Sequence, residues 1–173
     1  MASTSAAIQD GIGYIVSNRG NIWAINIKAR NWIFEHKITP MWRTAYLYGI
    51  APKPPVPSGF IWSHNTMADG RCSPMVIGNV IYTGTGNDLI ALTTDTGEEL
   101  WRFVSGATIA SSPAFADNTV YVGSDDSNLY ALDADSGAVR WEFPTGDRIV
   151  SSPAVADGVV YVGSYDGKLY AIE

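Results

Sequence analysis

The sequence predicts an all-β fold: a partial β-propeller of about four four-stranded antiparallel blades, the last incomplete, with an irregular insertion after the first blade. Three observations predict it, namely a repeat of 39 or 40 residues, short apolar runs separated by turn residues, and many aromatic side chains. A fixed period of this size is typical of repeat folds. The 173 residues include six Trp and nine Tyr, which favour strands because aromatic rings pack well on a pleated surface.

The repeat is clearest in the second half of the chain. Ser-Pro-Ala at 112–114 recurs at 152–154, and Tyr-Val-Gly-Ser at 121–124 recurs at 161–164. Within one copy, clusters of Asp, Asn, Ser and Gly separate four short apolar runs, as turns separate strands. Four such strands form one blade, and its two apolar faces are buried only when blades stack radially.

The chain is interpreted as a single propeller segment, 1–173. Its repeats cover approximately 7–37, 72–110, 111–150 and 151–173. The last repeat reaches Glu173 where its fourth strand is expected to begin.

A Pro- and aromatic-rich insertion, 38–70, separates the first two repeats. Trp32 and Pro74 are 42 steps apart, whereas Trp101 and Pro113 are 12 steps apart. A long loop in a compact fold is commonly functional or disordered, so a cover over a blade, a partner-binding loop and disorder all stay open. Aromatic and Arg side chains anchor interfaces, and the candidate partner contacts are therefore Trp42, Arg43, Tyr46, Tyr48, Phe60 and Trp62.

The net charge of −6 is unevenly distributed. Residues 1–71 carry seven Lys/Arg and three Asp/Glu, a net charge of +4. Residues 72–173 carry four Lys/Arg and fourteen Asp/Glu, a net charge of −10. An acidic surface repels nucleic acid, so no nucleic-acid partner is expected. The opposite net charges of the two halves would favour head-to-tail contact between chains. No apolar run approaches the roughly 20 residues of a transmembrane helix, and no signal peptide is visible at the N-terminus.

No residue pattern predicts a catalytic or metal site. Cys72 has no activating neighbour in the sequence, and His36 and His64 lie far apart without a metal-ligand spacing. The run from Asp133 to Gly137 is similar to the start of a calcium loop, but no acidic residue stands where the bidentate ligand is needed, since the chain there has Pro144, Thr145 and Gly146. We interpret this run as a turn.

One spacing resembles a known family. Ala-x5-Gly-x3-Trp occurs at Ala91, Gly97 and Trp101 and again at Ala131, Gly137 and Trp141. Together with the Ser-Ser-Pro-Ala and Val-Tyr-Val-Gly-Ser phrases, it resembles the tryptophan-docking motif of the PQQ-like repeat propellers. The resemblance implies that these six residues dock neighbouring blades, with Trp32 as the counterpart in the first repeat. Repeat one lacks the turn Gly, and repeat four lacks the Trp strand.

The family resemblance leaves three functions open. The first is a non-enzymatic protein-binding scaffold, similar to the propellers of outer-membrane protein assembly in the periplasm or cell envelope. The second is part of a PQQ-dependent alcohol dehydrogenase, whose PQQ and calcium site would lie outside this chain. The third is the ligand-sensing propeller of a receptor kinase. The chain has no Cys-Cys pair and no residues that match the dehydrogenase calcium ligands or base, so we expect no catalytic, cofactor or metal residues here.

Closed propellers have four to eight blades, and the resemblance implies seven or eight, so three and a half repeats are about half of a ring. The remaining blades would come from further sequence or from a second copy, a homodimer that closes the ring. By resemblance, the location is expected to be extracytoplasmic.

Overall fold

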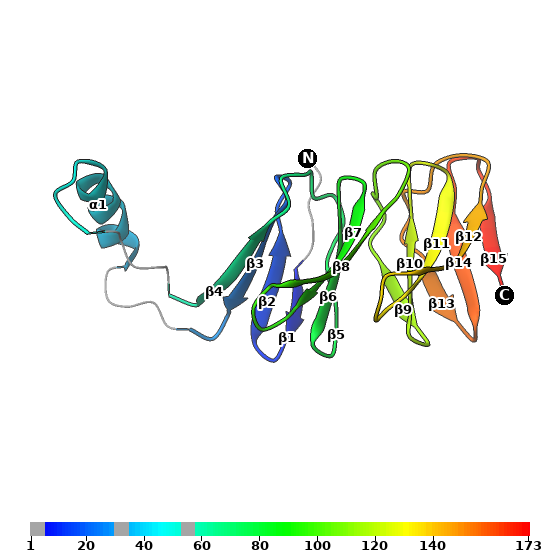
Figure 1. Ribbon diagram of the computed structural model, residues 1–173, viewed down its shortest axis with the longest axis horizontal. Helices are drawn as coiled ribbons and strands as arrows, with labels where there is room; N and C mark the ends of the chain where they lie inside the picture. Colours follow the sequence, from blue (N-terminus) through cyan, green and yellow to red (C-terminus); the bar gives the residue numbers. More distant parts are fainter. Residues whose placement is uncertain (1–5, 30–34, 53–57) are drawn as a thin grey trace.

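The structure, a computed structural model, describes residues 6–29, 35–52 and 58–173. Four antiparallel sheets stand side by side along the long axis of the molecule, with one helix beyond the first sheet (Figure 1). The predicted all-β propeller segment is confirmed. Three sheets have four strands and the last has three.

Each sheet is one blade, and its strands follow the chain order. Blade 1 contains β1 (Ala7–Gln9), β2 (Ile12–Val16), β3 (Asn21–Asn26) and β4 (Phe60–Asn65). Blade 2 contains β5 (Met75–Ile77), β6 (Val80–Thr85), β7 (Asp88–Thr93) and β8 (Glu99–Val104). Blade 3 contains β9 (Ala114–Ala116), β10 (Thr119–Gly123), β11 (Asn128–Asp133) and β12 (Val139–Pro144). Blade 4 contains β13 (Ala154–Ala156), β14 (Val159–Gly163) and β15 (Leu169–Ile172).

Short polar turns fix the strand registers. The first hairpins of blades 1, 3 and 4 have two-residue loops, and both loop residues have positive φ. In blade 4, for example, Asp157 and Gly158 have φ of 51° and 81°. This type I′ geometry matches the twist of antiparallel strands and suits Asp, Asn and Gly.

Every blade has two apolar faces, because side chains alternate along a strand. We call the side toward the next blade the front face, formed in blade 2 by Tyr82, Leu89, Ala91 and Trp101. The side toward the preceding blade is the back face, formed in blade 2 by Ile81, Ile90 and Leu92. Front faces pack on back faces, so the core is a series of three interblade layers.

The insertion lies within blade 1, between β3 and β4, and not after the blade as the repeat 7–37 and the insertion 38–70 imply. β4 pairs with β3 in the register Ala24 to Trp62, so part of the predicted insertion is the fourth strand of the blade. The insertion is also partly helical: α1 spans Glu35–Leu47.

Helix α1 ends in a defined cap. Gly49 has φ of 71°, its N–H donates to Tyr46, and the Ile50 N–H donates to Ala45. This pair of bonds is the Schellman arrangement, which Gly favours. In the described part of the chain, no helix has the length and hydropathy needed to cross a membrane.

Candidate functional site

Two tryptophans make the same hydrogen bond across a blade junction. Trp101 of blade 2 donates from Nε1 to the carbonyl of Ala134 in blade 3 at 2.8 Å. Trp62 of blade 1 donates from Nε1 to the carbonyl of Thr94 in blade 2, also at 2.8 Å. Both acceptors belong to the turn between the third and fourth strands of the next blade. The indole therefore combines apolar burial with a buried hydrogen bond.

A glycine on that turn makes room for each indole. A Cβ built on Gly137 would lie 2.5 Å from Cε3 of Trp101, and one on Gly97 would overlap the ring of Trp62. Gly97 and Gly137 have φ of 72° and 71°. Glycine serves here both for its positive φ and for the missing Cβ.

The small Ala of the motif lies opposite the Trp in its own blade. Ala91 pairs with Trp101, and Ala131 pairs with Trp141. Ala24 pairs with Trp62 in the same way. A register shift follows the Ala in all three blades, so the Ala, the bulge and the Trp recur as one unit.

The structure corrects the role predicted for Trp62. Only 7% of this residue is exposed, because it is packed between blades 1 and 2, so it is not available as a partner contact. Phe60 also belongs to β4 and lines the back face of blade 1. Trp32, the expected counterpart of Trp101, lies outside the described residues.

The spacing of Trp62 could have indicated its position. Trp62 precedes Pro74 by 12 residues, the same step as from Trp101 to Pro113. The sequence predicted Trp32, rather than Trp62, in the fourth strand of blade 1, because Trp32 follows β3 closely in the chain. The insertion separates the two candidates by 30 residues.

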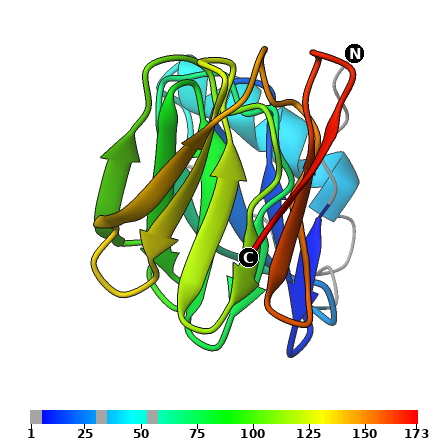
Figure 2. The ribbon, with the colours of Figure 1, turned by 90° about the vertical axis from the view of Figure 1, so that its right-hand side faces the viewer.

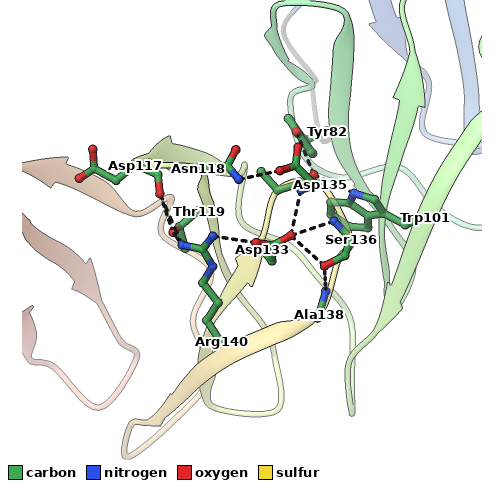
Figure 3. A network of polar contacts seen from close by, with 11 residues as sticks. Tyr82, Trp101, Asp117, Asn118, Thr119, Asp133, Asp135, Ser136, Ala138 and Arg140 are labelled. Carbon is green, nitrogen blue, oxygen red and sulfur yellow. Dashed lines mark hydrogen bonds and ion pairs between the residues drawn. The ribbon is translucent and has the colours of Figure 1, made fainter.

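A polar network stabilises the turn that receives Trp101 (Figure 3). One carboxylate oxygen of Asp133 accepts from the Ser136 hydroxyl at 2.8 Å, and the other accepts from Arg140 at 2.7 Å. The Arg140 guanidinium, followed by the Ser136 donors, lowers the pKa of Asp133 to about 2. The carboxylate is thus occupied by donors of its own blade, which agrees with a turn rather than a calcium loop.

Cys72 is buried and hydrogen-bonded within blade 2. Its thiol donates to the carbonyl of Gly84 at 2.9 Å and accepts from the Gly84 N–H at 3.0 Å. Burial raises the pKa of the thiol to about 11. Ser111 makes the same two bonds with Gly123, so Cys72 occupies a Ser position of the repeat.

The remaining predicted contacts lie on α1 and the loop that follows it. Arg43, Tyr46 and Tyr48 are exposed, and Trp42 is half-buried. The Trp42 Nε1 donates to the carbonyl of Pro52 at 2.9 Å, which holds the loop against the helix. Met41, Leu47 and Ile50 are also exposed, at 74%, 82% and 80%. The described part of the helix and its following loop thus exposes several large apolar side chains.

Blade 1 carries an apolar hollow on its back face. Trp23, Ile25, Ser58 and Phe60 line this hollow, which has a volume of about 230 Å³. Among the described residues, no group of three or more His, Cys, Asp or Glu side chains could hold a metal ion.

Comparison with known proteins identifies the family. The family model described as outer membrane protein assembly factor BamB matches residues 85–173. The chain belongs to this family. The predicted resemblance to PQQ-like repeat propellers is thereby confirmed, and the BamB family match covers just over half of the chain. No curated protein matches the sequence.

Solved structures share the fold at low identity. BamB from Moraxella catarrhalis matches with a TM-score of 0.73 and 19% identity, over 98% of this chain and 46% of that one. The computationally designed Ika4 protein matches with a TM-score of 0.71 and 16% identity, over 98% of this chain and 91% of that one. The computationally designed Ika8 protein matches with a TM-score of 0.71 and 17% identity, over 97% of this chain and 44% of that one. The chain thus spans about half of the Moraxella BamB chain and most of Ika4.

Proposed function

We propose that this chain is a non-enzymatic scaffold that binds other proteins in the cell envelope, in the assembly of outer-membrane proteins. The observation that carries the proposal is membership of the BamB family, whose description names an outer membrane protein assembly factor. A repeat scaffold acquires function where something is added to it. The addition here is the insertion within blade 1.

The partner contact is assigned to α1 and its following loop. Tyr48 and Leu47 are 77% and 82% exposed, and Tyr46 is 47% exposed. Large apolar side chains gathered on one exposed element are typical of interaction sites. Tyr and Arg, which are frequent among interface residues with large binding energy, are both represented. The cap at Gly49 ends the helix, and the bond from Trp42 to Pro52 joins the following loop to it.

The proposed location is extracytoplasmic, and the proposed function needs no cofactor. Addition of PQQ and calcium should therefore leave the visible absorbance of the purified chain unchanged. A new absorbance band with saturable binding would instead favour the dehydrogenase alternative.

The decisive experiment is complementation. Bacteria that lack their own BamB would express this chain with an added signal peptide, and the amount of folded outer-membrane proteins would be measured. We expect partial restoration by the parent chain and loss of that restoration with Tyr46→Ala/Tyr48→Ala. Leu100→Ala is the matched control, because Leu100 is 51% exposed on β8, far from α1 in the sequence.

Each outcome of this experiment is informative. If the control restores outer-membrane proteins and the double variant does not, α1 is the contact. If the parent chain accumulates in a folded form and restores nothing, the assembly role is contradicted. Equal restoration by parent and double variant would contradict the assignment to α1.

A further inference from the structure

The two end blades expose faces that every internal junction buries. Figure 1 shows blades 1 and 4 at opposite ends of the stack, and Figure 2 shows the stack from the blade 4 end. The front face of blade 4 and the back face of blade 1 have no neighbouring blade in this structure.

On its second and third strands, the front face of blade 4 has the same residue types as the buried front faces, but it has no fourth strand with a Trp. Leu169 holds the register position of Leu89 and Leu129, opposite a glycine of the second strand. Leu89 and Leu129 are 0% exposed, whereas Leu169 is 75% exposed. Tyr161 is 39% exposed, whereas its counterpart Tyr82 is 3% exposed. This face therefore presents the surface that elsewhere receives the next blade.

The back face of blade 1 is equally apolar. Trp23 and Ile25 hold the register positions of Ile90 and Leu92, which are fully buried against blade 1. Here they are only half-buried and line the hollow of about 230 Å³. Ile15, next to Trp23 in the ladder, corresponds to Val162, which is 1% exposed. The two end faces are thus a front and a back of the same junction type.

Charge favours contact between unlike ends. The described residues around blade 1, 6–29 and 58–71, carry three Lys/Arg and two Asp/Glu, or +1, and the blade 4 residues 151–173 carry one Lys and three Asp/Glu, or −2. Two blade 1 ends, or two blade 4 ends, would bring like charges together. A front-to-back arrangement brings opposite charges together, and complementary charge selects orientation.

We propose that a second copy of this chain is the occupant of both end faces. The front face of blade 4 in each copy packs on the back face of blade 1 in the other, and two such contacts close one ring. Four blades from each copy give eight, within the range of closed propellers. Closure by a two-fold axis also limits the assembly to two copies.

The first test is the mass of the chain in solution, measured by light scattering across a concentration series. We expect about twice the chain mass of 18.6 kDa at high concentration and a shift toward monomer in high salt. Leu169→Asp should shift the equilibrium toward monomer at least tenfold, while Leu100→Asp should not. Both leucines are exposed, so neither change disturbs the core of the single chain.

The second test is disulfide trapping between copies. Leu129 clusters with Val160 and Val162 across the junction of blades 3 and 4, which predicts that Leu169 meets Ile15 of the second copy. Leu169→Cys and Ile15→Cys would be prepared separately in a Cys72→Ser background, mixed and oxidised. A crosslinked pair is expected from this mixture and not from Leu100→Cys mixed with Ile15→Cys.

A chain that stays monomeric at all concentrations overturns the proposal. A mass that keeps rising with concentration indicates open polymers and also overturns the closed pair. A dimer that Leu169→Asp leaves intact, with no Leu169 to Ile15 crosslink, assigns the contact to another surface and contradicts the inference. None of these outcomes depends on complementation by α1, so this proposal and the proposed function fail separately.

Discussion

Replacement of Gly137 by Ala tests whether the blades are held by close packing of an indole on a turn. The new Cβ would lie 2.5 Å from Cε3 and 2.7 Å from Cδ2 of Trp101. The ring cannot retreat easily, because it is 8% exposed and its Nε1 is bonded to Ala134. The positive φ of 71° adds roughly 1–2 kcal/mol for a residue with a Cβ. Overpacking adds about 1–3 kcal/mol, so the free energy of unfolding should fall by about 2–5 kcal/mol.

Gly78→Ala is the matched control. Gly78 has φ of 57°, and a Cβ built there meets nothing within 4 Å, so this variant reports the backbone cost alone. Urea unfolding followed by circular dichroism gives both values, with equal slopes required for the comparison. In a Trp101→Ala background, Gly137→Ala should cost no more than Gly78→Ala, because the clash is gone. Equal losses for Gly137→Ala and Gly78→Ala in the parent chain would refute the docking geometry.

Three further predictions concern other residues. Trp101→Ala should lower the free energy of unfolding by about 3–5 kcal/mol, whereas Trp141→Ala should cost roughly half as much. Trp141 is only half-buried, since no turn of a following blade covers it in this structure; equal costs in urea unfolding would contradict this. Asp133→Asn should lower the melting temperature at pH 7, and the difference should shrink as the pH falls from about 4 toward 2. The pKa of Asp133 is lowered to about 2 by Arg140 in the folded protein, so its stabilising charge is present above the usual carboxyl pKa and is lost through that range; a difference that does not change with pH would contradict the ion pair. Cys72 should resist a thiol reagent at pH 8 until urea unfolds the chain, because burial raises its pKa to about 11; rapid labelling of the native chain would show that the thiol is accessible.

The sequence predicted the elements wherever the repeat is regular. Turn residues and short apolar runs gave the four-stranded order of blades 2 and 3, because each local choice agrees with the period. Matching of the repeats also predicted the incomplete blade 4, which has three strands. These predictions succeeded because the position of a strand within a blade depends on nearby turns.

The prediction failed where the chain leaves the period and returns. The fourth strand of blade 1 comes after α1, so its pairing with β3 joins residues far apart in the sequence. Local spacing favoured Trp32, whereas the register of Ala24 with Trp62 selects the later strand. Helix α1 was also missed, because a Pro-rich segment with a Pro inside the helix resembles an irregular loop.

The surfaces available for binding follow from the same repeat. An internal blade uses its front and back faces to bury its neighbours, so neither face can bind anything else. Among the described residues, α1 with its following loop and the two end blades expose apolar side chains that the blade junctions do not bury. The insertion exposes Leu47 and Tyr48 at 82% and 77%, and the blade 4 end exposes Leu169 at 75%, whereas its internal counterpart Leu129 is 0% exposed. The two kinds of surface are separable, because α1 differs from any blade and suits a different protein, while the end faces repeat an internal junction and suit a second copy of the same chain.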